Sequence, residues 1–257
     1  MDSWHTLRAF TQARIGQGSA GSAQKTRSLM EFQLAHAEAR DAVWKEWDFE
    51  LFRMAVEKRF GSAIQLTSQA HSRALYLQRP DLGRSLNKES REALQSSPGK
   101  GADVALIVSN GLSTTAVEAH TLKLLEALTH SLSASGLSTS PIVIVPNGRV
   151  ALSDEIGAAL RSRASLILIG ERPGLSSADS LGAYITLTPT PGNTDAERNC
   201  LSNIREPDGL DYRTAANKIC YLILKGLQQR IRGVFLKDDS PDDPLLLEES
   251  LRLIARA

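Results

Sequence analysis

The chain has 257 residues, of which 42% are hydrophobic and 23% are charged, as in ordinary globular proteins. Its 30 lysines and arginines nearly balance its 29 aspartates and glutamates, which gives a formal net charge of +1 and argues against nucleic acid as a partner. The two cysteines are too few for a disulfide framework and lack zinc-binding spacing. No apolar run reaches the roughly 18 residues of a membrane-spanning helix, and the N-terminus lacks a signal-peptide pattern, so we expect a cytoplasmic protein.

The N-terminal region is predicted to be helical. Residues 28–60 carry apolar side chains at helical spacing without an internal proline or glycine, which predicts either one long helix or a broken pair. Ser28 precedes Glu31 by three residues, as in a capping box, so we place the helix start there. Turn-forming residues follow at 79–83 and 96–99. We therefore assign residues 1–100 to an N-terminal helical region.

The central part of the chain alternates between two patterns. Continuous apolar runs rich in Val, Ile and Leu occupy residues 103–108, 141–146 and 164–170, which is typical of strands covered on both faces. Helical patterns at 113–132 and 153–163 separate these runs. The alternation predicts an α/β fold with an open doubly wound, mostly parallel, Rossmann-like sheet in a domain spanning residues 101–236.

Three further elements are expected after the third run. Residues 183–187 predict a weaker strand, and residues 214–232 an amphipathic helix. Residues 237–257 predict a flexible acidic linker that ends in a short helix.

Ligands of doubly wound sheets bind beyond the carboxyl ends of the strands, which directs attention to the loops at 109–113, 147–150 and 170–175. In the last loop Glu171 and Arg172 adjoin before a Pro-Gly turn. These two residues favour equally an ion pair that braces the turn or a ligand contact. Further on, residues 195–204 form a short non-repetitive segment rich in hydrogen-bonding groups.

Signs of a self-sufficient enzyme are weak. Gly16–Gly21 has the glycine spacing of a dinucleotide-binding loop but follows no strand. The five histidines all lie outside the strand-end loops. Histidines in such positions are more often packed or solvated side chains than general bases. The acidic pairs 238–239 and 242–243 favour a solvated tail over a metal site. We assign no catalytic residue and no metal ligand.

Five segments of the chain match one known family in the same order. They are the predicted helix at residues 29–43 and the motifs Ala-Arg-Ile-Gly16, Arg-Pro-Asp-Leu-Gly83, Gly-Glu-Arg-Pro-Gly-Leu-Ser-Ser177 and Arg-Asn-Cys-Leu-Ser-Asn-Ile204. From about Trp4 to Leu236, the chain thereby resembles the small (light) subunit of adenosylcobalamin-dependent ethanolamine ammonia-lyase. Asn110 departs from the aspartate usual in that family, and the tail after Leu236 lies outside the resemblance.

The resemblance implies a subunit that binds a cofactor without doing its chemistry. In that family the small subunit pairs with a large barrel subunit in a hetero-oligomer, adenosylcobalamin lies between them, and the large subunit carries the catalytic residues. The pair converts ethanolamine to acetaldehyde and ammonia by radical chemistry, in the cytoplasm or inside a bacterial microcompartment.

The family's cofactor-contacting positions match Val150, Glu171 and Cys200. We expect Glu171 to accept hydrogen bonds from corrin amides, Val150 to give apolar contact, and Cys200 to pack against the corrin without ligating cobalt. Two alternatives remain open. The chain could be a stand-alone α/β enzyme that binds a nucleotide or small substrate, or a purely structural subunit that never touches the cofactor.

Overall fold

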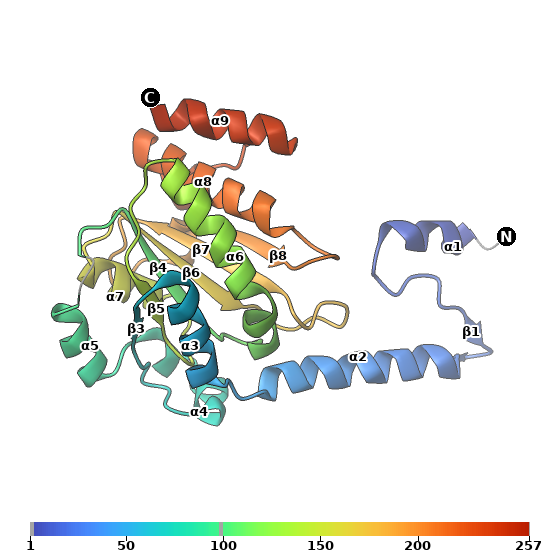
Figure 1. Cartoon of the computed structure of the whole chain (residues 1–257). Helices are drawn as coiled ribbons and strands as arrows, with labels where there is room; N and C mark the ends of the chain where they lie inside the picture. The colour runs from blue at the N-terminus through green and yellow to red at the C-terminus, as the bar shows by residue number, and fades with distance from the viewer. Residues whose placement is uncertain (1–2, 98–99, 257) are drawn as a thin grey trace.

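A six-stranded sheet packed between helices forms the body of the molecule in the computed structural model, which describes residues 3–97 and 100–256 (Figure 1). The spatial order is β3-β5-β4-β6-β7-β8. Pairings among the first four of these strands are parallel, and the last two strands run antiparallel. Their bounds are β3 Ala63–Gln65, β4 Val104–Ser109, β5 Ile142–Ile144, β6 Ala164–Gly170, β7 Leu181–Leu187 and β8 Arg198–Ile204. The predicted α/β class with a mostly parallel sheet is confirmed.

Helices cover both faces of the central strands. One face packs against α3 (Phe49–Phe60), α6 (Thr114–Ala134) and α8 (Tyr212–Gln229), and the other against α5 (Lys88–Gln95) and α7 (Leu152–Ala159). Successive side chains of a strand point to opposite faces. In β4, Leu106 and Val108 join the first core, whereas Ala105 and Ile107 join the second. Both faces of these strands are therefore buried from solvent, which explains the unbroken apolar runs in the sequence.

The predicted helical stretch at 28–60 is a broken pair, α2 (Thr26–Trp44) and α3. The second helix starts where the Asp48 carboxylate accepts a hydrogen bond from the backbone N–H of Leu51 at 3.1 Å, a common N-cap. The predicted capping box at Ser28 is wrong, because α2 begins two residues earlier. Glu31 instead accepts a hydrogen bond from Arg27 one turn before it, at 2.9 Å.

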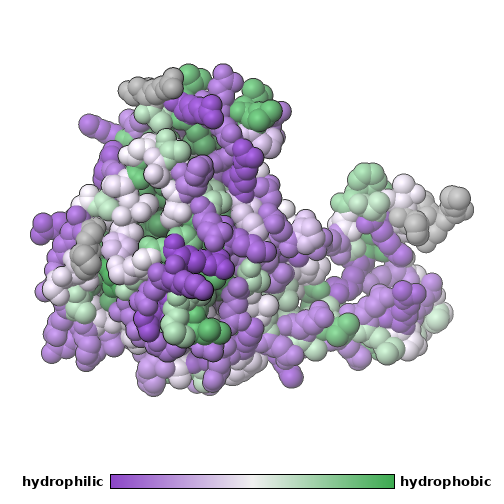
Figure 2. Space-filling view, in the orientation of Figure 1, coloured by the Kyte–Doolittle hydropathy of each residue, from purple (hydrophilic) through white to green (hydrophobic). Residues whose placement is uncertain are grey.

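Helix α2 projects from the body as an arm that carries the N-terminal segment at its far end (Figure 1). Its buried residues are Ala35 and Ala42, and several larger apolar side chains of the arm are exposed (Figure 2). The segment before α2 contains α1 (Ser3–Leu7) and a small hairpin of β1 (Ser19–Ala20) and β2 (Ala23–Gln24). It also contacts the body, since the Arg14 side chain donates to the carbonyl of Leu175.

Strand β3 lies within the N-terminal region that was predicted to consist of helices and turns. It pairs with β5 through residues 63–65, so part of this region belongs to the central sheet. Three residues are too few to give a periodic signal. Between this strand and β4 lie α4 (Arg73–Gln78), a 3-10 turn at Leu82–Arg84, and α5. Pro98 and Gly99 of the second predicted turn are outside the described residues, and the division at residue 100 stays a prediction.

Element ends differ from prediction by a few residues, and β8, like β3, was not predicted as a strand. Helix α7 ends at Ala159 instead of residue 163, and α8 ends at Gln229, where Arg230 takes a left-handed conformation. The predicted non-repetitive segment 195–204 is instead a 3-10 turn, Asp195–Glu197, followed by β8. This edge strand exposes much of its length, so it lacks the apolar run of a buried strand.

The C-terminal tail docks on the body. Helix α9 (Pro244–Arg256) packs against α8 and buries Leu247 and Leu251, and the Arg213 guanidinium of α8 is paired with Glu248. The acidic segment before α9 is also attached, since Lys218 of α8 contacts Asp238 at 3.2 Å. The remaining short 3-10 turns are Arg8–Phe10 and Gly233–Phe235.

Replacement of Leu247 by alanine should lower the free energy of unfolding by about 2–5 kcal/mol, because the side chain is fully buried and its removal leaves a cavity. The neighbouring Leu246 is 53% exposed, so Leu246→Ala is a matched control that should cost far less. Chemical denaturation of both variants checks this. Equal loss in the two variants would mean that α9 is not docked.

Candidate ligand-binding site

A cavity of about 710 Å³ opens at the carboxyl ends of β4 and β6. All three strand-end loops singled out in the sequence contribute to it, through Leu112, through Arg149 and Val150, and through Gly170 to Arg172. The start of β7 and the end of β8 complete it, because both lie beside the carboxyl end of β6 in the antiparallel part of the sheet. Its other lining residues are Gln12, Tyr76, Ile169, Ser176, Ser177, Ser180, Tyr184, Ser202, Asn203 and Arg205. We call it the strand-end cavity.

Two glycines allow the loops after β4 and β6 to touch behind this cavity. A Cβ atom on Gly170 would lie 2.0 Å from the carbonyl oxygen of Ser113, and one on Gly111 would lie 2.3 Å from the carbonyl oxygen of Gly170. Gly111 also has a φ of +53°, which favours glycine. The contact is closed by a hydrogen bond from the N–H of Leu112 to the carbonyl of Gly170, at 2.8 Å.

Asn110 links two of the loops. Its side-chain oxygen accepts from the backbone N–H of Asn147 at 2.8 Å, and its amide group donates to the Thr114 hydroxyl at 3.3 Å. An aspartate could keep the first hydrogen bond but could not donate the second when ionised. The residue is buried and absent from the cavity wall, so the departure at this position affects loop geometry and not the charge of the cavity.

Glu171 is held by donors from two strands. Its Oε2 atom accepts from the hydroxyls of Ser180 and Ser202 and from the backbone N–H of Asn203, and its Oε1 atom accepts from Ser202 at 2.7 Å. The carboxylate therefore joins the loop after β6 to the ends of β7 and β8. No ion pair forms between Glu171 and Arg172 in the described chain, so the bracing pair with Arg172 is absent. Oε1 retains room for a second donor.

Val150 lies between two cavities. It lines the strand-end cavity and also a neighbouring cavity of about 330 Å³. Arg149 and Tyr184 line both as well, so the two cavities adjoin. Cys200 lines only the second. The structure therefore places all three sequence-predicted residues on one connected surface, with Val150 at its middle.

Cys200 lies on β8 opposite Tyr184 of β7, so their side chains are cross-strand neighbours. Although Cys200 as a whole residue is exposed, desolvation of its thiol, opposed by the Tyr184 hydroxyl and assisted by the Glu171 charge, raises the pKa of the thiol to about 11. Desolvation and the neighbouring thiol also raise the pKa of Tyr184. Both groups are therefore neutral near pH 7, which suits packing against a ligand better than nucleophilic attack or metal ligation.

Alkylation of Cys200 by iodoacetamide should be slow, because a thiol with a raised pKa is roughly one-thousandth thiolate at pH 8. In a Cys220→Ser variant, which leaves one thiol, the rate should keep rising tenfold per pH unit to above pH 10. Mass spectrometry of the timed reaction measures it, with free cysteine as the control. A rate that levels off near pH 9 would contradict the environment described for this thiol.

A guanidinium cluster beside the cavity was missed in the sequence. The Arg149 guanidinium lies 4.2 Å from the ring centre of Tyr76, and that of Arg73 lies 5.1 Å from it. The Tyr76 ring is fully buried. Because Tyr76 and Arg149 lie in different predicted regions, only the fold brings them together. The usable signal was an arginine directly before Val150 in a strand-end loop.

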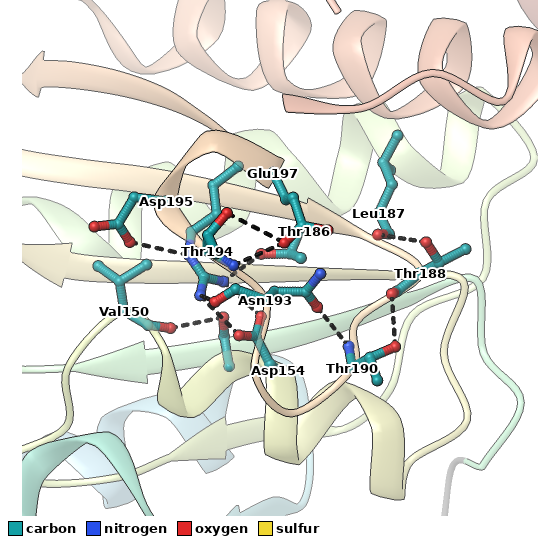
Figure 3. Close-up of polar contacts among 12 residues, drawn as sticks. Val150, Asp154, Thr186, Leu187, Thr188, Thr190, Asn193, Thr194, Asp195 and Glu197 are labelled. Atoms are coloured by element: carbon teal, nitrogen blue, oxygen red, sulfur yellow. Dashed lines mark hydrogen bonds and ion pairs between the residues drawn. The ribbon is translucent and has the colours of Figure 1, made fainter. Parts of the chain in front are cut away.

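A buried ion pair ties α7 to β8 beneath the second cavity. Arg198 donates to both oxygens of Asp154, at 2.6 and 2.8 Å, and also to Thr186 and to the carbonyl of Asn193. Figure 3 shows Asp154, Thr186 and Asn193 gathered at this point. The Arg198 and Asp154 side chains are 3% and 1% exposed. This two-pronged geometry fixes the element that follows Val150 against the strand that carries Cys200.

The histidines do not converge on the cavity. His120 of α6 is buried, with Nδ1 2.8 Å from the Tyr212 hydroxyl and Nε2 3.2 Å from Asp179. His36, His71 and His130 are exposed. The expectation of packed or solvated histidines holds for these four side chains.

Metal-binding groups are likewise not seen. Within the described part of the chain, no three His, Cys, Asp or Glu side chains gather as a group that could hold a metal ion. Over residues 3–97 and 100–256, no helix combines the length and apolar character needed to cross a membrane.

Fold and cavity together define an α/β protein of the doubly wound class with a candidate ligand site at the carboxyl ends of its parallel strands. Sequence comparison identifies the family. The chain belongs to the ethanolamine ammonia-lyase light chain family, because the family model described as "Ethanolamine ammonia-lyase light chain (EutC)" matches residues 1–237.

Similar proteins named ethanolamine ammonia-lyase small subunit cover nearly the whole chain. Those of Xanthomonas campestris pv. campestris and Azotobacter vinelandii are both 47% identical to it, over 95% and 92% of this chain and 90% and 88% of their own lengths. The Pseudomonas putida protein is 45% identical over 96% of this chain and 92% of its own. The family matched is the one that the sequence motifs resemble.

Proposed function

We propose that this chain completes the adenosylcobalamin site of an ethanolamine ammonia-lyase. In this proposal it pairs with a large barrel subunit in a hetero-oligomer that converts ethanolamine to acetaldehyde and ammonia. The large subunit carries the catalytic residues, and this chain carries none. When bound, adenosylcobalamin supplies the radical chemistry, and the protein supplies binding and orientation.

The walls of the two adjoining cavities fit a corrin edge. Corrin side chains end in amides, which need both donors and acceptors. The strand-end cavity offers serine hydroxyls, arginine N–H groups and the Asn203 amide as donors, and Glu171 as an acceptor. With about 710 Å³, it is large enough for part of a cobalamin but not for all of it, so a partner must cover the rest.

Each sequence-predicted residue has a role in this fit. Glu171 Oε1 keeps an acceptor site for an amide N–H after its hydrogen bond from Ser202. Val150 gives an apolar contact between the two cavities. Cys200 stays a thiol, because its pKa is raised to about 11, and packs beside the macrocycle without ligating cobalt. The observation that carries the proposal is that these three residues, far apart in the chain, line one connected surface.

Co-expression with a large subunit tests the proposal. Pull-down should recover both chains together, and the pair should deaminate ethanolamine when adenosylcobalamin is added, whereas each chain alone should be inactive. Full activity of the large subunit alone would refute it. Turnover by this chain alone would instead support the alternative of a stand-alone α/β enzyme.

We also propose that the complex works in the cytoplasm, either free or within a bacterial microcompartment. The two cysteines are both free, which suits a reducing compartment.

A further inference from the structure

The cluster of Arg73, Tyr76 and Arg149 carries positive charge without an acidic partner. In the described chain, neither arginine forms an ion pair, and each has a buried nitrogen without a hydrogen-bond partner, Nη2 of Arg73 and Nε of Arg149. The other buried arginines beside these cavities are balanced, since Arg198 pairs with Asp154 and Arg205 lies 3.5 Å from Asp179. Unsatisfied buried charge is costly, so its retention calls for a ligand.

Arg73 is the concealed member of the cluster. It is 8% exposed, and it donates to the carbonyl of Val43 at 2.7 Å and to that of Gly111 at 2.5 Å. Burial lowers the pKa of Arg73, and the nearby Arg149 charge lowers it further. The two cations beside the Tyr76 ring repel each other, and an anion beside Arg149 would relieve that repulsion.

Arg149 is the accessible member, and it is rigid. Its backbone N–H donates to the carbonyl of Gly83 at 2.7 Å, its Nη2 donates to the carbonyl of Tyr76 at 3.2 Å, and its guanidinium stacks on the Tyr76 ring. It lines both cavities. A guanidinium fixed before a ligand arrives loses little entropy on binding, which favours a specific anion contact.

Arg172 adds a second uncompensated cation to the wall of the strand-end cavity. No hydrogen bond or ion pair joins its side chain to the rest of the described chain, and it is exposed. The Glu171 carboxylate in the same wall is directed to serine hydroxyls and a backbone N–H, so it neutralises neither arginine. Two guanidinium groups without an acidic partner in the described chain, lining one cavity, suit a phosphate, whose oxygens accept paired N–H donors.

We propose that Arg149, backed by Arg73 and assisted by Arg172, forms a binding site for a phosphate ester. This inference rests on the proposed function, and in the assembled complex we assign the phosphate to the diester of the cobalamin nucleotide arm. Arg149 and Arg172 then hold the nucleotide arm at the strand-end cavity, while Glu171, Val150 and Cys200 face the corrin amides and the corrin edge.

Comparison of two corrinoids tests the assignment, because adenosylcobinamide lacks the nucleotide arm and its phosphate. The complex with the large subunit is titrated with each corrinoid, and binding is followed by absorbance after gel filtration. For Arg149→Met, affinity for adenosylcobalamin should fall about tenfold, as expected for loss of one charge-assisted contact. Affinity for adenosylcobinamide should change less than twofold. Arg149→Lys, which keeps the charge but not the fork, should give an intermediate loss.

The control is Arg252→Met on α9, an exposed arginine away from both cavities, which should leave both affinities unchanged. Equal losses for the two corrinoids in Arg149→Met, or no loss for either, would overturn the phosphate assignment alone. Failure of the wild-type complex to bind either corrinoid would overturn the proposed function as well. Inorganic phosphate that protects the wild-type complex against heat, without competing with adenosylcobalamin, would assign the site to a free phosphate and overturn its link to the cofactor.

Discussion

Replacement of Arg198 by methionine should lower the free energy of unfolding by about 3–5 kcal/mol. The change leaves the Asp154 carboxylate, which is 1% exposed, as a buried charge without its cation, and such a charge costs far more than the ion pair itself contributes. It also removes the hydrogen bonds that Arg198 donates to the Thr186 hydroxyl and to the carbonyl of Asn193. Denaturant unfolding followed by circular dichroism measures the loss.

A double variant separates the charge from the shape of the site. In Arg198→Met with Asp154→Leu, no charge is left unpaired, so the loss should be smaller than in Arg198→Met alone. Arg230→Met, at an exposed position past the end of α8, is a control with little expected effect. A double variant no more stable than Arg198→Met would contradict the account, because it would show that the unpaired Asp154 charge is not the main cause of the loss.

Replacement of Glu171 by alanine should weaken adenosylcobalamin binding by the assembled complex about tenfold to a hundredfold. The change removes an ionised acceptor from the cavity, and a hydrogen bond to a charged group contributes about 1.5–3 kcal/mol. It also frees the hydroxyls of Ser180 and Ser202, which position the ends of β7 and β8. Equilibrium titration with the cofactor checks it.

Glu171→Gln is the matched variant, because it keeps the shape and one oxygen acceptor but removes the charge. We expect its affinity to lie between those of the wild type and Glu171→Ala. Thermal unfolding of the isolated chain is measured alongside, since the carboxylate also braces the loops. A large drop in stability with unchanged cofactor affinity would favour the purely structural subunit.

Local sequence patterns predicted the central strands well, because a strand buried on both faces appears in the sequence as a continuous apolar run. The runs that became β4 and β6 are entirely buried. Neither strand has a solvent-facing side, so neither has the alternating polar residues of a half-exposed strand. Strand β8 gave no such signal, because in this edge strand the buried residues Arg198, Leu201 and Ile204 are separated by exposed or half-buried residues. The first buried residue of β8 is Arg198, and a charged residue is not expected at a buried strand position.

The loops of the candidate site were predictable, but their chemistry was not. The rule for ligand sites at strand ends located the loops that hold Val150 and Glu171, and the polar segment 195–204 includes Cys200. The family resemblance alone supplied the contact role of these three residues and the ligand. The adjacent Glu171 and Arg172 suggested an ion pair. The Glu171 carboxylate instead accepts hydrogen bonds from Ser202 and Asn203, about 30 residues away in the chain. Partners at that separation depend on the register of β7 and β8, which the sequence does not specify.

Adenosylcobalamin titration into three samples tests the central claim most directly: the large subunit alone, this chain alone, and the two together. If this chain completes the cofactor site, the pair should bind the cofactor at one molecule per pair, and each separate chain should bind it much more weakly. Binding by the large subunit alone with the affinity of the pair would contradict the claim.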